Sequence, residues 1–385
     1  MAMEKKITAG RALSFYKFFD HHTGEMRDSI WDLLEDGLWQ DFSIDNFLYN
    51  ESVGDMKPEE WKPVFPYITP IGAGFRWDAQ RQCVKLDYYH PRRIEDADMS
   101  TFLSAAECFF SRYEGKKIGV HLSGGLDTSL IIGLLRHFHI PFVLAGLKSD
   151  RFEMRTERHI QQILGELGEE TFLLDIEETP SFSHLERVPK HQVPCEFIRG
   201  NEADKVLAQV FCSAGVEVVF TGQGGDSLLM EDESHGLAQY NIGYEFLTPW
   251  SAEMHYKPLG IDLVSPLADT EIIDQISNLR LGQAEDTSKL WARHFFRDFL
   301  PRELSDYCYV ADFFGLTLDG LDRAKTTIES LFEECNDLVH HHVFSPTETR
   351  KLLNTSVYSF DIKEYIDFCA RISVAVWYHA LFRKA

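Results

Sequence analysis

From about residue 96 onward, short apolar runs alternate with longer stretches in which apolar residues recur at helical spacing. The apolar runs predict buried strands at residues 118–122, 142–147, 172–174 and 216–220. The longer stretches predict helices at residues 99–113, 128–137, 155–167 and 202–213. This alternation is typical of βαβ crossovers, which join parallel strands. It predicts an α/β fold, a parallel sheet with helices on both faces, and the pattern after about Asp269 predicts a helical C-terminal lobe.

The first 95 residues follow a less regular pattern. They predict helices at residues 12–19 and 28–34 and a hairpin within residues 66–90. The hairpin would turn at Asp78-Ala79-Gln80, and a linker is expected at Pro91-Arg92-Arg93 because acidic residues follow it directly. The chain therefore divides into a small N-terminal α+β region, residues 1–95, and a main domain, residues 96–385.

Net charge, hydropathy and cysteine content argue against nucleic-acid-binding, membrane-bound and disulfide-stabilised classes of protein. The chain has 385 residues, and 38 basic against 61 acidic residues give a net charge of -23. Such a surface would repel a polyphosphate backbone, so we expect no nucleic-acid partner. No apolar run reaches the ~18 residues of a membrane span, and no signal peptide is evident, so we expect no membrane partner. Seven cysteines without CxxC spacing fit a reduced, cytoplasmic protein.

The segment Ser-Gly-Gly-Leu-Asp-Thr-Ser at residues 123–129 lies between a predicted buried strand and a predicted helix. Glycines let the backbone turn tightly, and the unpaired amides of a first helical turn attract phosphate. Asp127 would repel phosphate unless it held a Mg²⁺ ion that bridges to the phosphate oxygens. The GxxxxGK[ST] pattern of a Walker loop is absent from this segment. The segment therefore predicts a distinct pyrophosphate loop, and its plainer interpretation is a capped strand-to-helix turn.

A second glycine turn, Thr-Gly-Gln-Gly-Gly-Asp at residues 221–226, also follows a predicted buried strand. In open parallel sheets, ligands bind outside the carboxyl ends of the strands. We therefore expect the two turns to face one crevice, in which Asp127 and Asp226 share a metal ion.

Together, SGGLDTS and GQGGD resemble the PP-loop ATP pyrophosphatases, an adenine nucleotide α-hydrolase-like fold. Within that superfamily they are similar to the synthetase domain of the asparagine synthetase family, which includes β-lactam synthetases and lasso-peptide macrolactam cyclases. The resemblance covers about residues 98–300. It implies that a substrate carboxylate attacks the α-phosphate of ATP, which gives an acyl-adenylate and pyrophosphate. An amine then displaces AMP.

The resemblance implies a role for each matching residue. The pyrophosphate loop would consist of Ser123, Gly124, Gly125, Asp127, Thr128 and Ser129. Backbone atoms that hold the adenosine of ATP would come from Leu122, Ala145, Gly146, Thr221 and Gly222. The Mg²⁺ ion would be bound by Asp127 and Asp226. The catalytic residues would be Gln223, Lys289 and Arg293, and the charge of Lys289 suits it to neutralise phosphates.

Three positions depart from the family pattern. Ala2 stands where glutamine-dependent members carry a cysteine nucleophile, and the N-terminal region is too short for their glutaminase domain, so we expect no glutamine hydrolysis. Gln223 stands where asparagine synthetases carry glutamate and β-lactam synthetases tyrosine, and a glutamine cannot accept a proton as a general base. Tyr309 stands where the family carries a lysine, which Lys257, Arg293 or Arg302 would have to replace.

These observations predict an AMP- and pyrophosphate-forming ligase that makes an amide or lactam bond, in the biosynthesis of a specialised metabolite or a modified peptide. Its partners would be a small-molecule or peptide carboxylate and an amine, and a homodimer or a biosynthetic partner protein is left open. Sulfur transfer or lysidine-type modification of tRNA is one alternative, which the net charge of -23 disfavours. A catalytically impaired nucleotide-binding subunit is another, and Gln223 and Tyr309 favour it.

Overall fold

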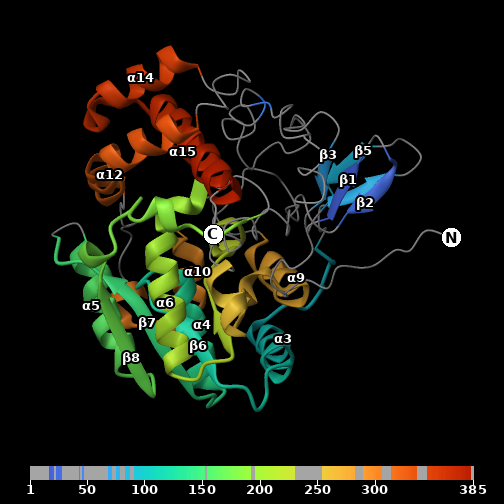
Figure 1. Ribbon diagram of the computed structural model, residues 1–385. Helices are drawn as coiled ribbons and strands as arrows, with labels where there is room; N and C mark the ends of the chain where they lie inside the picture. The colour runs from blue at the N-terminus through green and yellow to red at the C-terminus, as the bar shows by residue number, and fades with distance from the viewer. Residues whose placement is uncertain are drawn as a thin grey trace. The chain divides into compact units, whose positions relative to one another are not determined.

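Two compact units make up the chain in the computed structural model (Figure 1). The first comprises residues 1–13, 88–179 and 203–312, and the second residues 14–87, 180–202 and 313–385. The structure describes residues 17–20, 23–27, 43, 46, 68–71, 75–78, 83–86, 91–151, 154–191, 196–229, 254–281, 289–305, 314–335 and 345–382. Within that part of the chain, no helix is long and apolar enough to cross a membrane.

The first unit is built on a five-stranded sheet in which every pairing is parallel. Its strands are β6 (Ile118–His121), β7 (Phe142–Lys148), β8 (Glu170–Asp175), β9 (Val218–Phe220) and β10 (Asp262–Val264). They lie in the order β10-β9-β6-β7-β8. The predicted α/β fold is confirmed, and so are its four predicted strands. The fifth strand, β10, was not predicted, because it has only three residues and becomes a strand by pairing with β9.

Helices cover both faces of this sheet, as predicted. The helices described in the first unit are α3 (Met99–Ser111), α4 (Leu126–His137), α5 (Arg155–Gly165), α6 (Asn201–Ser213), α7 (Gly225–Leu229), α9 (Thr270–Arg280), α10 (Leu290–Phe295) and α11 (Arg302–Ser305). Helix α6 belongs to this unit from residue 203 onward. Side chains of successive strand residues alternate between two cores. Val120 of β6 packs in the core with α3, α4 and α9, whereas Val143 of β7 packs with Phe211 of α6.

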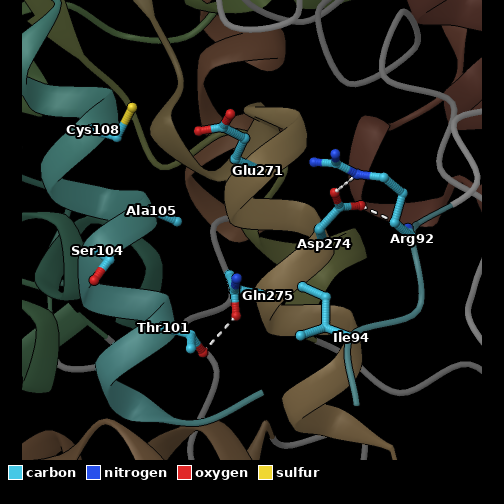
Figure 2. A pocket seen from close by; sticks show the side chains of 9 residues that line it. All are labelled: Arg92, Ile94, Thr101, Ser104, Ala105, Cys108, Glu271, Asp274 and Gln275. Atoms are coloured by element: carbon cyan, nitrogen blue, oxygen red, sulfur yellow. Dashed lines mark hydrogen bonds and ion pairs between the residues drawn. The ribbon is translucent and has the colours of Figure 1, made fainter. Parts of the chain in front are cut away.

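The predicted linker is fastened to α9 of the same unit (Figure 2). Asp274 of α9 is 1% exposed and accepts hydrogen bonds from the Arg92 backbone N–H at 2.8 Å and from its Nε at 2.6 Å. Asn278, one turn further along α9, accepts from the Ile94 N–H and donates to the Arg92 carbonyl. The linker therefore reaches α3 along a path fixed by two buried polar side chains.

In its described residues, the second unit has two small antiparallel sheets and the helices α12 (Phe314–Glu334), α14 (Pro346–Asn354) and α15 (Ile362–Phe382). One sheet has the order β2-β1-β3, with β1 at Lys17–Asp20, β2 at Glu25–Arg27 and β3 at Ile68–Ile71. The other is the predicted hairpin, of β4 (Phe75–Asp78) and β5 (Cys83–Leu86), in which Asp78, predicted to begin the turn, ends β4 and pairs with Cys83.

The helix predicted at residues 12–19 is wrong at its C-terminal end. Residues 17–19 belong to β1, which pairs with a strand on each side, so sheet pairing overrides the local helical pattern. A turn signal follows directly, because Asp20 accepts hydrogen bonds from Thr23 and Gly24 adopts a left-handed φ of 71°. The helix predicted at residues 28–34 lies outside the described residues.

We predict that Asp274→Ala destabilises the first unit. The substitution removes a buried acceptor from two hydrogen bonds of Arg92, so the free energy of unfolding should fall by about 1–3 kcal/mol. Urea unfolding measures this value. Glu107→Ala on the exposed side of α3 is the control and should change it by no more than about 0.5 kcal/mol. Equal effects of the two substitutions would show that Asp274 does not fasten the linker.

The structure also predicts an acid sensitivity at the end of β6. The imidazole Nε2 of His121 lies 2.7 Å from the Tyr256 hydroxyl, and burial lowers the pKa of His121 to about 4. Below a pH of about 6.5 the unfolded chain binds a proton at this position and the folded chain does not. The free energy of unfolding therefore decreases as the pH is lowered from about 6.5 to about 4. His121→Gln should make that fall shallower, and His159→Gln, at an exposed position, should not. Urea unfolding at several pH values tests this, and parallel curves for all three proteins would contradict it.

Candidate functional site

Both predicted glycine turns connect a strand to a helix at the carboxyl edge of the sheet. The first joins β6 to α4, and the second joins the neighbouring β9 to α7. Each contains a glycine with left-handed backbone, Gly124 at φ 82° and Gly224 at φ 81°. Residues with a Cβ rarely adopt this conformation, so the glycines determine the shape of both turns.

The two turns lie against each other, with glycines at the contact. A Cβ on Gly222 would lie 2.9 Å from Thr128 Cγ2 and 3.0 Å from Asp127 Cβ. A Cβ on Gly225 would overlap the Asp127 carboxylate. The glycines thus let the second turn approach the side chains of the first, and the shared metal ion remains a prediction.

Three charged side chains meet at this contact. The Lys289 ammonium lies 2.7 and 2.9 Å from the two carboxylate oxygens of Asp127, and 2.5 Å from Asp226 Oδ1. The Asp127 and Lys289 side chains are 18% and 11% exposed, whereas Asp226 is 80% exposed. Lys289 precedes α10 with a left-handed φ of 58°. The structure therefore brings Asp127, Asp226 and Lys289 together, and Lys289 is not on a solvated helix surface.

Two carboxylates and two cations act on one another at this site. Burial raises the pKa of Asp127 and the Asp226 carboxylate adds to the rise, whereas the Lys289 ammonium and, more weakly, the Arg293 guanidinium oppose it. Magnesium is usually bound by one or two carboxylates together with phosphate oxygens and water, and the pair of carboxylates fits that donor set.

The hydroxyl groups of the first turn bond within the turn. The Ser123 and Thr128 hydroxyls lie 2.7 Å apart, and Ser123 Oγ accepts from the Gly125 N–H. Ser129 is fully buried and donates to the Gly125 carbonyl at 2.6 Å, so it closes the turn. Gly125, the N-cap of α4, offers no capping side chain. The first amides of α4 are thus left for an anion.

The residues predicted to hold adenosine line the same edge. The Leu122 N–H donates to the Ala145 carbonyl at 2.8 Å, and the Thr221 N–H donates to the Val264 carbonyl at 2.9 Å. Gly146 packs so closely on the Leu122 carbonyl that a Cβ would overlap it. Strand pairing therefore holds this backbone in place, and its contact with adenosine remains a prediction.

The other predicted catalytic residues differ in their surroundings. Gln223 lies at the second turn, and its carbonyl accepts a hydrogen bond from Ser265 Oγ. Arg293 is 4% exposed, donates from Nη1 to the Leu304 carbonyl at 2.7 Å, and carries a charge that opposes the rise in the pKa of Asp127. Lys257 and Arg302 are exposed, and Tyr309 lies outside the described residues.

Two residues that contact the turns were not predicted from the sequence. Ser265 is fully buried and supports Gln223 from the end of β10, which was not predicted. Gln161 of α5 is 2% exposed and contacts the first turn. A polar residue at a buried helical position was the available signal, since Gln161 follows the buried Ile160 on the apolar face of α5.

Comparison with known proteins supports the resemblance. The sequence model of the asparagine synthase family matches residues 113–259, a range that includes both glycine turns. The prediction of this resemblance is confirmed over that range. Among solved structures, the chain is similar to NMN synthetase from Francisella tularensis, with 14% identity and a TM-score of 0.26 over 58% of this chain and 92% of the other. A search of curated proteins gave no match.

We predict that Lys289→Met destabilises the site when Mg²⁺ is absent. Asp127 and Asp226 then lose the ammonium that bonds to both of them, and the free energy of unfolding should fall by about 1–3 kcal/mol. Adding Mg²⁺ should restore stability to this variant more than to the wild type. Urea unfolding with and without Mg²⁺ measures both effects, and Lys257→Met is the control at an exposed lysine. A variant as stable as wild type without Mg²⁺ would contradict the role of Lys289.

Proposed function

We propose that this protein is an ATP-dependent ligase that joins a carboxylate to an amine with release of AMP and pyrophosphate. A carboxylate oxygen attacks the α-phosphorus of ATP, and the bond from that phosphorus to the oxygen bridging to the β-phosphate breaks. The amine nitrogen then attacks the acyl carbon, and the carbon–oxygen bond to AMP breaks. The nitrogen is supplied as an amine or as ammonia, without glutamine hydrolysis.

The convergence of Asp127 and Asp226 on the Lys289 ammonium carries this proposal. A phosphate chain needs cations, and the two carboxylates fit Mg²⁺, which when bound neutralises phosphate charge. The family match over residues 113–259 supports the same conclusion, because both turns fall within it.

The residues of the chain have separate tasks in the first half of the reaction. The amides at the start of α4 bind phosphate oxygens through the positive end of the helix dipole. Lys289 moves its charge from the carboxylates to the departing pyrophosphate, where a fixed cation stabilises developing negative charge. The Leu122 and Gly146 backbones hold the nucleoside.

In the second half, Gln223 orients a substrate by hydrogen bonds. Its amide has no useful pKa, so the proton lost by the attacking amine passes to solvent or to a group on the substrate. A substrate whose amine is already unprotonated at neutral pH suits such a site. The substrate carboxylate is that of a small molecule or a peptide.

A nucleotide-binding subunit that supports a partner enzyme is the second candidate function. The identity of Gln223 favours it, since that position lacks an acid–base group. The buried bond from Arg293 to the Leu304 carbonyl also favours it, because it engages a predicted catalytic cation. Binding of ATP without turnover, until a partner is added, distinguishes this function.

Incubation with ATP, Mg²⁺ and a panel of amino acids and amine-bearing carboxylic acids tests the ligase proposal. We expect pyrophosphate and AMP in equal amounts, detected by chromatography, because the α–β phosphate bond breaks. Asp127→Asn should lower the rate at least about 100-fold, since phosphate charge is then poorly balanced. The exposed Asp150→Asn is the control and should keep the rate. Release of ADP in place of AMP would contradict the proposal.

A further inference from the structure

A single buried amide on α5 joins the two halves of the predicted nucleotide site. Gln161 Nε2 donates to the Leu147 carbonyl at 2.7 Å, to the Leu122 carbonyl at 2.9 Å and to the Ser123 carbonyl at 3.3 Å. Gln161 is 2% exposed, so little water competes for these bonds. A primary amide has two N–H groups, so two of the three carbonyls share one of them.

The three carbonyls belong to different parts of the site. Leu147 lies near the end of β7, directly after the predicted adenosine contacts Ala145 and Gly146. Leu122 is itself a predicted adenosine contact, and Ser123 begins the phosphate turn. The register of β6 with β7 ends at His121 and Ala145, where the Leu122 N–H still donates to the Ala145 carbonyl, and Leu147 pairs with β8. Gln161 thus connects the two segments beyond the last register pair of β6 and β7.

A second contact from α5 supports the same turn. Glu157, one helical turn before Gln161, places its carbonyl where a Cβ on Gly124 would lie only 2.5 Å from it. Gly124 is the left-handed residue of the phosphate turn. The turn therefore rests on α5 at two points, a backbone contact at Glu157 and the side-chain bonds of Gln161.

We propose that Gln161 is a positioning residue that holds the phosphate turn against the end of β7 in the arrangement that binds ATP. It does not touch the reacting atoms. It acts through the Leu122, Ser123 and Leu147 carbonyls, and so sets the distance between the nucleoside contacts and the amides at the start of α4. This inference rests on the proposed function, because it concerns how the same site binds ATP.

Two variants of similar shape test the donated hydrogen bonds. Gln161→Met removes the donor, and Gln161→Glu presents a carboxylate to three carbonyls. Gln162→Ala, at the exposed neighbouring glutamine, is the control. We expect Gln161→Met to weaken ATP binding about tenfold, Gln161→Glu more than that at pH 8, and Gln162→Ala not at all. Isothermal titration with ATP and Mg²⁺ measures the affinities, below the unfolding temperature of each variant.

The pH dependence separates positioning from general stability. A protonated glutamic acid can donate one hydrogen bond, so Gln161→Glu should regain ATP affinity relative to wild type as the pH falls from 8 to about 5.5. Gln161→Met has no proton to gain, so its ratio to wild type should stay constant.

Each outcome decides one question. Lower unfolding temperatures with wild-type affinity for ATP would overturn the inference, because Gln161 would then serve stability alone. A Gln161→Glu variant without recovery at low pH would overturn it as well. If the wild-type protein does not bind ATP, the proposed function is wrong. If the wild type binds ATP tightly and the Gln161 variants bind it equally well, only the role of Gln161 is wrong.

Discussion

The site depends on one ion-paired contact, the Lys289 ammonium between the carboxylates of Asp127 and Asp226. Two neighbouring strands each end in a glycine turn, and each turn contributes one of these carboxylates. Without a cation the carboxylates would repel each other at the closest approach of the turns. The two carboxylates are ligands of the kind that Mg²⁺ uses when it binds together with phosphate oxygens.

The same contact explains why so many glycines meet here. Gly222 and Gly225 allow the second turn to lie on the Asp127 side chain, and Gly124 takes the left-handed backbone that lets α4 begin directly behind it. Substituting either of the first two would separate the carboxylates. The ion group and the glycines are therefore one structural feature, in which backbone shape determines the spacing of the charges.

Much of this could be predicted from the sequence, because the signals are local. Apolar runs indicate buried strands, and a glycine pair between a strand and a helix indicates a phosphate turn. What could not be predicted depends on partners far away in the chain. The three residues of β10 form a strand because they pair with β9, and residues 17–19 form a strand because they pair with β2 and β3. Gln161 and Ser265 contribute to the site because they donate hydrogen bonds to carbonyls of the two turns.

The central claim is that both turns bind one phosphate chain together with Mg²⁺. Isothermal titration with ATP across a series of Mg²⁺ concentrations tests it most directly, with Asp127→Asn and Asp226→Asn beside the wild type. We expect the ATP affinity of the wild type to rise with Mg²⁺, and each substitution to abolish most of this rise. ATP binding that is independent of Mg²⁺, or a full Mg²⁺ effect in either variant, would contradict it.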